Sequence, residues 1–412
     1  MNLKPLIDDK AKVADWMVED ITHVCKDFET RSPGTKGEEQ YCEYAADLCK
    51  NEYGCDTATV ESFKEHPWSF FGWIWYTIAL LLIGLVLAFV GWHLIAVILY
   101  VCGLLIALIQ FGGYFRFMDK LFPEKTGHNM TATKKPTGTV ERRILFNGHA
   151  DAAWEWPVNY ALGGVGFESH AIICAVGAVY YIVVGILCMV QLGLFTRAQS
   201  GVLLQMMLWG LLFTPFWFGL NFLWNPRRIV DGANDNLSGC YMGLAILKEL
   251  QEKGIEFEHT EVGVLITGSE EAGLRGAKAW CEAHQGEYDD VPTFIYSFDT
   301  IHDPKQLMVN YRDLNGTVKT DKDANDLFME AAEELGIFCK KGWVPPLGGA
   351  TDTAAFTQGG FRSGGITGLN HKLESYYHTR KDSYDNMNKT GLADCYAVTV
   401  KVLEKFDEGA KQ

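Results

Sequence analysis

Charged residues are missing from three long stretches of this 412-residue chain. No Asp, Glu, Lys or Arg occurs in residues 66–115, 169–196 or 198–226. A run of about twenty apolar residues is long enough to cross a bilayer as a helix. The chain is 48% hydrophobic overall, so its apolar residues are concentrated in these stretches and the remainder has mixed polarity.

The chain also has no block of Lys and Arg. It carries 36 basic and 51 acidic residues, for a net charge of −15. Binding to a phosphate backbone requires basic stripes. We therefore exclude nucleic acid as a partner and interpret the acidic excess as a solvated surface.

Two further absences concern cysteines and targeting. The eleven cysteines form no Cys-x-x-Cys pair, and an odd count with two members in one apolar run favours reduced thiols. Cys42, Cys49 and Cys55 have no fourth ligand at zinc-finger spacing. The opening residues contain no apolar signal-peptide core, so we do not expect a secreted protein.

The charge-free stretches predict two transmembrane hairpins, 68–115 and 171–224. The first has its turn at GWH near Trp92, and the second has its turn at FTRAQS. Aromatic residues gather at the ends, as they do at membrane interfaces, and Pro215 is expected to kink the last helix. Core helices of a soluble protein are the alternative, but four charge-free runs of this length disfavour it. We expect a multi-pass integral membrane protein in contact with a lipid bilayer.

Two hairpins place all four outer helix ends on the same side of the membrane. The basic residues near those ends are Arg116, Lys120, Lys125, Arg227 and Arg228. The opposite turns offer only His93 and Arg197. The positive-inside rule then predicts that the globular part is cytoplasmic.

The globular part is expected to comprise residues 1–67, 116–170 and 225–412. It contains roughly 300 residues, enough for one large α/β domain. Helix is predicted over about 15–53 with a break at RSPGTKG, followed by a strand at TATVESF. Later segments alternate between strand and helix: RRILFNGHAD, SGCYMGLAILKELQEKG, TEVGVLITGSEE, AGLRGAKAWCEAH and PTFIYSFDT. This alternation predicts an α/β fold.

Five side chains suited to metal binding lie at strand ends or in adjacent loops. They are His149, Asp235, Glu271, Asp299 and His378. In an open α/β sheet the active site lies at the carboxyl ends of the strands. Each residue alone is a weak signal, because a histidine after a strand is commonly structural and acidic pairs suit helix N-termini. Together, these donors suit a pair of zinc ions in a hydrolase, although they would also accept manganese or cobalt.

The segments around these residues resemble a known family. They are TRSPGTKGEEQYCEYAADLC, NGHAD, GANDNLSG, GSEEAGLRGAKAW, GGATDTAAF and YYHTRKDSYDNMN. As a set they resemble the co-catalytic zinc aminopeptidases of metallopeptidase family M28, which share a fold with glutaminyl cyclases. The resemblance implies a zinc-exopeptidase, phosphorylase/hydrolase-like fold, with a mixed central sheet flanked by helices. The four transmembrane helices would be insertions into it.

The resemblance also implies a ligand set for two zinc ions. His149 and Asp299 would bind one ion, and Glu271 and His378 would bind the other. Asp235 would bridge them, and the peptide bond that follows Asp235 is expected to be cis.

Three further roles follow from the resemblance. Glu270 would be the general base, and Asp151 would accept the second imidazole proton of His149. Asp352 is only a candidate for positioning substrate, because the family often has His after this Asp, whereas this chain has Thr353. Asn236 stands where the family usually has a second acidic residue, and an isosteric amide should change the loop little.

The expected function is a membrane-anchored aminopeptidase that removes N-terminal residues from peptide substrates. The alternatives are a carboxypeptidase, amidohydrolase or glutaminyl cyclase of the same fold, and a non-catalytic receptor-like relative. Transport is disfavoured, since the apolar runs hold few polar residues. The hairpins would either only anchor the enzyme or bring amphipathic, membrane-derived peptides to it. The sequence leaves the oligomeric state and side-chain preference open.

Overall fold

The computed structural model describes residues 2–370, 372 and 374–409. Its contacts divide the chain into two units, which we call the globular unit and the apolar unit. The globular unit comprises Met1–Pro67, Glu124–Glu155 and Arg227–Gln412, and the apolar unit comprises Trp68–Pro123 and Trp156–Pro226. The apolar unit therefore includes residues 116–123, 156–170 and 225–226, which the sequence led us to expect in the globular part.

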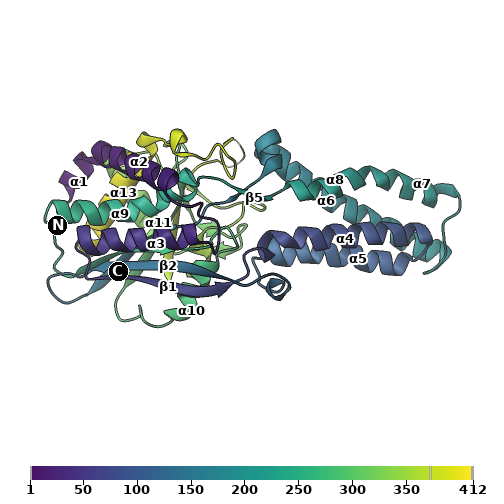
Figure 1. The fold of residues 1–412 in the computed structure, drawn as a ribbon, viewed down its shortest axis with the longest axis horizontal. Coiled ribbons are helices and arrows are strands. Elements are labelled where there is room, and N and C mark those ends of the chain that lie inside the picture. The colour runs from purple at the N-terminus through teal and green to yellow at the C-terminus, as the bar shows by residue number, and fades with distance from the viewer. Residues whose placement is uncertain (1, 371, 373, 410–412) are drawn as a thin grey trace. The chain divides into compact units, whose positions relative to one another are not determined.

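The globular unit is built on one eight-stranded sheet (Figure 1), in the order β1-β2-β6-β3-β7-β12-β8-β11. The strands are β1 Thr57–Glu65, β2 Lys125–Lys134, β3 Arg142–His149, β6 Thr260–Thr267, β7 Thr293–Ile301, β8 Met308–Asn310, β11 Lys340–Gly342 and β12 Arg362–Gly368. The pairs β3–β6, β3–β7, β12–β7 and β11–β8 are parallel. The pairs β1–β2, β2–β6 and β12–β8 are antiparallel. The predicted mixed sheet is confirmed.

The strands at the centre of the sheet are buried on both faces. All eight residues of β6 are buried, which explains its nearly continuous apolar run. On β3, Phe146 belongs to the main hydrophobic cluster, whereas the neighbouring Leu145 is buried outside that cluster. This alternation follows from the two-residue period of a strand.

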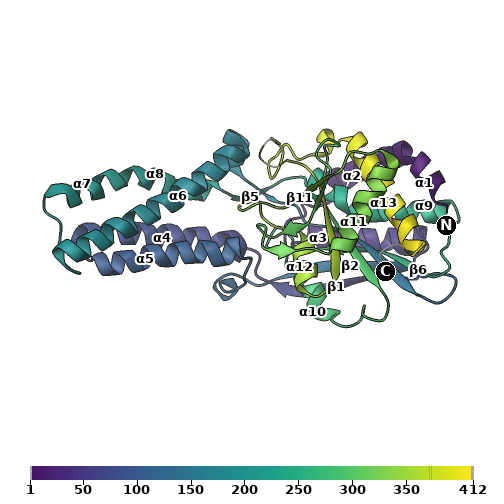
Figure 2. The same ribbon diagram turned by 180° about the vertical axis from the view of Figure 1, so that it is seen from behind.

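Helices cover both faces of the sheet. They are α1 Lys4–Asp8, α2 Lys10–Asp27, α3 Lys36–Asp47, α9 Ser238–Glu252, α10 Arg275–Ala283, α11 Lys322–Leu335, α12 Asp352–Gln358 and α13 Lys389–Asp407. The two opposite views place α2, α3 and α9 on one face of the sheet and α10 on the other (Figures 1 and 2). The predicted helices at 15–53 correspond to α2 and α3, and the break between them falls at RSPGTKG.

The start of α9 is fixed to the end of β7. The hydroxyl of Ser238 donates to the carbonyl of Asn234 at 2.6 Å and accepts the Ile301 N–H at 2.8 Å. Because the segment before α9 carries Asp235, these bonds position that loop at the carboxyl end of the sheet.

The apolar unit contains four helical segments that are long and apolar enough to span a membrane. They are Ser69–Val90 (α4), His93–Gly112 (α5 and the turn that extends it), Pro157–Leu192 (α6) and Gly201–Phe222 (α7, α8 and two short 3-10 turns). The first turn falls at Gly91, whose φ is 101°, as predicted.

Two details of the apolar helices differ from expectation. Helix α6 begins at Pro157 rather than near residue 171, and it is kinked at Gly163, whose φ is 71°. The last span is interrupted by a 3-10 turn, Leu211–Phe213, ahead of Pro215 in the first turn of α8. Pro215 has no N–H to donate to the carbonyl of Leu211, four residues earlier, and its ring would clash with that carbonyl in a regular helix, which accounts for the break at Leu211.

Within the apolar unit, small residues allow close packing. The rings of Tyr100 and Tyr181 stack with centroids 5.4 Å apart, and a Cβ at Gly210 would lie 2.6 Å from the Tyr181 ring. The two turns of the unit also meet, since His93 Nε2 lies 2.9 Å from the Thr196 carbonyl. Large apolar side chains nevertheless stay exposed, such as Val190 at 78%.

A substitution at Gly148 tests the close packing of β3 against α9. A Cβ there would lie 2.3 Å from the backbone nitrogen of Cys240, so Gly148→Ala should destabilise the globular unit by about 1–3 kcal/mol. The measurement is thermal unfolding of the purified full chain. Gly103→Ala is the control, because its added Cβ would meet its nearest neighbour at an ordinary 3.6 Å. Equal melting temperatures for the two variants would contradict this description of the packing.

Candidate metal centre

Three parallel strands deliver potential ligands to one edge of the sheet. His149 is the last residue of β3, Glu271 follows β6, and Asp299 lies near the end of β7. Because β6, β3 and β7 are neighbours and run parallel, their carboxyl ends meet. The loop before α9 adds Asp235 to this edge.

The five predicted ligands converge in two groups. One group is His149, Asp235 and Asp299, and the other is Asp235, Glu271 and His378. Within each group, the potential ligand atoms all lie within 4.8 Å of one another. Asp235 belongs to both, which is the arrangement expected of a bridging carboxylate. Among the described residues, the one further group of three that could hold an ion combines His149, Glu271 and Glu270.

The two oxygens of Asp235 face different histidines. Its Oδ1 lies 3.2 Å from His149 Nε2, and its Oδ2 lies 3.0 Å from His378 Nε2. His378 Nε2 also lies 3.2 Å from Glu271 Oε1. All four residues are buried, so this close set of nitrogen and oxygen atoms is shielded from solvent.

The donor set fits a pair of divalent cations. His149 Nε2, Asp235 Oδ1 and Glu271 Oε1 are buried and make no hydrogen bond within the described part of the chain. Buried polar atoms of this kind require a partner. Burial, followed by the charge of Asp235, raises the pKa of Asp299 to about 8. Such crowding of acids is relieved by bound cations, and mixed imidazole and carboxylate ligands suit zinc.

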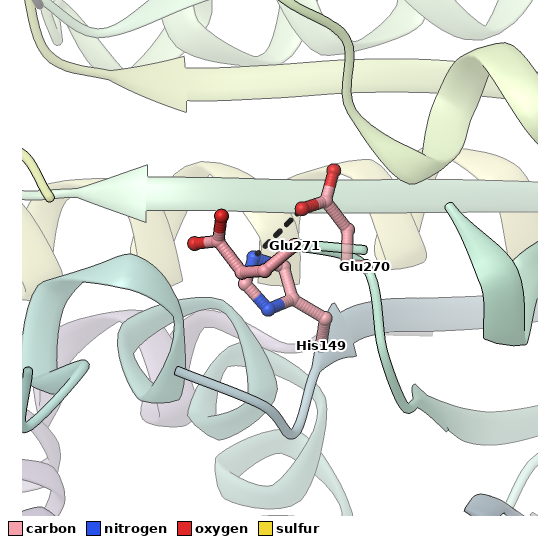
Figure 3. A group of neighbouring side chains, drawn as sticks. All are labelled: His149, Glu270 and Glu271. Carbon is pink, nitrogen blue, oxygen red and sulfur yellow. Dashed lines mark ion pairs between the residues drawn. The ribbon is translucent and has the colours of Figure 1, made fainter. Parts of the chain in front are cut away.

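Glu270 lies beside the metal ligands. Its Oε2 is 3.8 Å from His149 Nε2, and Figure 3 shows its carboxylate diverging from that of Glu271. The strained turn at Ser269, with φ at 53°, starts this segment and lets the two adjacent side chains point to different places. Burial raises the pKa of Glu270.

Asp151 holds the backbone that carries both glutamates. Its Oδ1 accepts the Glu270 N–H at 2.9 Å, and its Oδ2 accepts the Glu271 N–H at 3.0 Å. The nearest oxygen to His149 Nδ1 is the Asp151 carbonyl, at 3.1 Å, whereas the carboxylate Oδ1 is 3.4 Å away. A proton on Nδ1 that is shared with this carbonyl would leave Nε2 as the metal-facing nitrogen.

Asn236 and Asp352 are both buried near the centre but belong to neither ligand group of the five residues. The Asn236 amide donates to Phe298 O at 2.8 Å, and the peptide bond between Asp235 and Asn236 is cis, as the resemblance implies. Asp352 begins α12 and accepts a hydrogen bond from Thr267 at the end of β6. Burial raises its pKa to about 6.

Asp382 is a contact that sequence reasoning missed. Its Oδ1 accepts the Asn234 N–H at 2.8 Å and the Asn234 side-chain amide at 2.9 Å, while its Oδ2 accepts the Asp235 N–H at 3.1 Å. It is fully buried. Its position four residues after His378 was the available signal, but nothing in the sequence links that segment to the loop before α9.

Comparisons with known proteins agree with this architecture. The profile described as Peptidase family M28 matches residues 221–403, a segment that contains every predicted site residue except His149 and Asp151. The search of curated protein sequences found no significant match.

Several solved structures have the same fold. A zinc aminopeptidase from Bacillus subtilis matches with a TM-score of 0.57 and 13% identity, covering 95% of each chain. An aminopeptidase from Aneurinibacillus sp. strain AM-1 gives 0.56 and 13%, covering 97% of this chain and 95% of that one. A glutaminyl cyclase from Bacteroides thetaiotaomicron gives 0.52 and 12%, covering 95% and 96%. The globular fold is therefore that of zinc aminopeptidases and glutaminyl cyclases.

Asp382→Asn tests whether that residue holds the loop that carries Asp235. An asparagine has one acceptor oxygen, and its NH2 group would face donors that now meet a carboxylate. We expect zinc affinity to fall about 10–100-fold, measured by competition with a chromogenic chelator. Glu249→Gln is the control, because Glu249 is equally buried but lies near the far end of α9. An unchanged zinc affinity in Asp382→Asn would contradict the inference that Asp382 holds the loop that carries Asp235.

Proposed function

We propose that the protein is a membrane-embedded member of Peptidase family M28 that hydrolyses N-terminal residues from peptides. The observation that carries the proposal is the pair of buried ligand groups that share Asp235, with Glu270 beside them. The fold shared with zinc aminopeptidases and the family match support it. Fold alone does not define activity, so the proposal rests on the centre.

The ligand assignment follows the two groups. His149 and Asp299 would hold one zinc ion, Glu271 and His378 would hold the other, and Asp235 would contribute to both sites. When bound, a zinc pair polarises the scissile carbonyl and lowers the pKa of a water. The chain's own contribution is to fix these donors: Asp151 and Asp382 hold the backbone of the two loops that carry Glu271 and Asp235.

Glu270 then moves the proton. Its carboxylate accepts a proton from the attacking water as the water oxygen bonds to the carbonyl carbon. It returns that proton to the departing amine nitrogen as the C–N bond breaks, so the carboxylate is regenerated. Burial of Glu270, 7% exposed, keeps competing water away from this transfer.

Glu270→Gln tests the assignment of the base. The glutamine keeps the shape of the side chain but cannot accept a proton, so we expect kcat to fall about 10²–10⁴-fold with zinc content unchanged. Aminoacyl-amide substrates, with N-acetylated peptides as the blocked comparison, report activity, and elemental analysis reports zinc. Glu271→Gln is the matched control, because removal of a ligand should lower zinc content as well. Full activity in Glu270→Gln would contradict the assignment.

The second candidate is a glutaminyl cyclase, because a protein of that activity shares the fold. Cyclisation of N-terminal glutamine with about one zinc per chain would favour it over the aminopeptidase. Turnover of unblocked peptides with two zinc ions per chain would favour the aminopeptidase.

We also propose that the apolar unit spans the bilayer and that the globular unit faces the cytoplasm. The four long apolar helices and their exposed side chains support the first part. The basic residues around 116–125 and 227–228, against Arg197 in the turn between α6 and α7, support the second.

Insertion of a glycosylation acceptor tests this orientation. A long Gly/Ser spacer that carries Asn-Ser-Thr is placed between Gln199 and Ser200, and in a second variant between Gly286 and Glu287. In a microsomal translation system, we expect the first insertion to be glycosylated and the second to stay unmodified. The reverse pattern would place the globular unit on the lumenal side.

A further inference from the structure

Each of the two chain segments that lead into the apolar unit from the globular unit ends on a buried carboxylate. Glu65 is the last residue of β1, three residues before Trp68, where the apolar unit begins. Glu155 is the last residue of β4 (Trp154–Glu155) and directly precedes Trp156. These carboxylates are 3% and 1% exposed, so each must have a compensating partner within the protein.

The partner of Glu65 lies in the turn that carries the catalytic glutamates. Glu65 Oε1 is 2.6 Å from the hydroxyl of Ser269, which directly precedes Glu270. The same hydroxyl is 2.7 Å from Glu38 Oε2, and it also receives the Gly34 N–H at 3.1 Å.

The hydrogen inventory of this network assigns a proton to Glu65. A serine hydroxyl has one hydrogen, so Ser269 donates to only one of its two carboxyl neighbours. Burial, followed by the charge of Glu65, raises the pKa of Glu38 as well, so the two carboxyls compete for a proton. Glu38 accepts the backbone N–H groups of His128 and Ser269, both at 2.9 Å, and these two bonds favour the ionised form of Glu38 over that of Glu65. Glu65 Oε2 makes no hydrogen bond to any described residue. The consistent arrangement has Ser269 donating to Glu38 and a protonated Glu65 donating to Ser269.

The nearest partner of Glu155 lies in the loop that carries the ligand His378, while Arg228 Nε lies farther off, 3.8 Å from Glu155 Oε2. Arg380, two residues after that histidine, donates through Nε to Glu155 Oε1 at 2.5 Å and through Nη2 to Oε2 at 2.8 Å. Its backbone N–H also approaches Oε1, at 3.4 Å. Two parallel charge-assisted bonds fix both the position and the orientation of the pair.

Both loops need such support because their backbones are unfavourable. Ser269 and His378 have φ values of 53° and 51°, in the left-handed region that residues with a Cβ rarely adopt. Conformations of this kind persist when the surrounding contacts determine them. Glu65 bonds to Ser269 itself, and Glu155 holds the chain two residues beyond His378.

We propose that Glu65 and Glu155 are positioning residues that fix the two ligand-bearing loops to the chain segments entering the apolar unit. The proposal rests on the function proposed above.

Substitutions in the full chain, embedded in phosphatidylcholine nanodiscs, test the proposal. Glu65→Ala and Glu155→Gln should each lower zinc affinity and kcat about 10-fold or more. Glu65→Gln should stay within about 2-fold of the parent, because its amide N–H can donate to Ser269 in place of the acid. Glu261→Gln is the matched control, since it breaks a buried pair with Arg143 at the opposite end of β6. It should also stay within about 2-fold in both measurements.

Two outcomes would overturn the proposal. One is a Glu65→Ala variant with the zinc affinity of the parent, and the other is a Glu261→Gln variant as impaired as Glu155→Gln. Zinc affinity distinguishes a failure of this proposal from a failure of the proposed function. If the parent chain binds zinc but cleaves no peptide, the proposed aminopeptidase activity is contradicted, and the positioning roles of Glu65 and Glu155 can still be tested by zinc affinity.

The pH dependence of stability gives an independent readout for Glu65. Burial raises the pKa of Glu65 to about 8; the hydrogen bond with Ser269 opposes this, Asp151 adds to it, and Arg275 and Lys125 oppose it. Glu38, whose pKa burial also raises, faces Glu65 through Ser269. A raised acid pKa contributes stability below the unfolded value, which is lost as pH rises through the folded one. As the pH rises from about 5 to 8, the melting temperature of the parent should therefore fall more than that of Glu65→Gln. Parallel pH profiles would show that Glu65 carries no proton.

Discussion

The candidate metal centre depends on one structural constraint. Three adjacent parallel strands end at the same edge of a sheet and bring acidic and imidazole groups into a buried space. His149, Glu271 and Asp299 arrive there on β3, β6 and β7, and the loop before α9 adds Asp235. Buried carboxylates so close together are unfavourable without compensating positive charge. The same crowding that would destabilise an empty centre suits these residues to bind divalent cations.

The backbone around the centre is held by a further set of buried carboxylates. Asp151 binds the N–H groups of Glu270 and Glu271, and Asp382 binds those of Asn234 and Asp235. Asp151 and Asp382 hold the backbone of the ligand-bearing loops, so they can position a ligand without touching its side chain. The geometry of the centre therefore depends on these supporting carboxylates as well as on the five ligands.

Sequence patterns predicted the fold well, because it follows from local signals. The five residues that the family resemblance singled out lie together in the structure, and their roles as ligands stay a prediction. Buried strands such as β6 have a nearly continuous apolar pattern, and the polar residues that follow them mark the sheet edge. The missed features are long-range contacts between loops. Nothing local links Asp382 to Asp235, or Glu65 to Ser269, because each pair is brought together only by the folded topology. The extra length of α6 was missed for a similar reason: residues 157–170 contain glycines and polar residues that dilute the apolar pattern.

Similarity of 12–13% to solved aminopeptidases and a glutaminyl cyclase establishes the fold, and the chemistry depends on what the centre holds. The most direct test is a crystal structure with anomalous diffraction measured on both sides of the zinc absorption edge. The account predicts two zinc peaks, each about 2.0–2.2 Å from its nitrogen and oxygen ligands, with one oxygen of Asp235 on each ion. A single peak would contradict the two-ion centre, and zinc bound elsewhere with these side chains hydrogen-bonded to one another would contradict the metal centre as a whole.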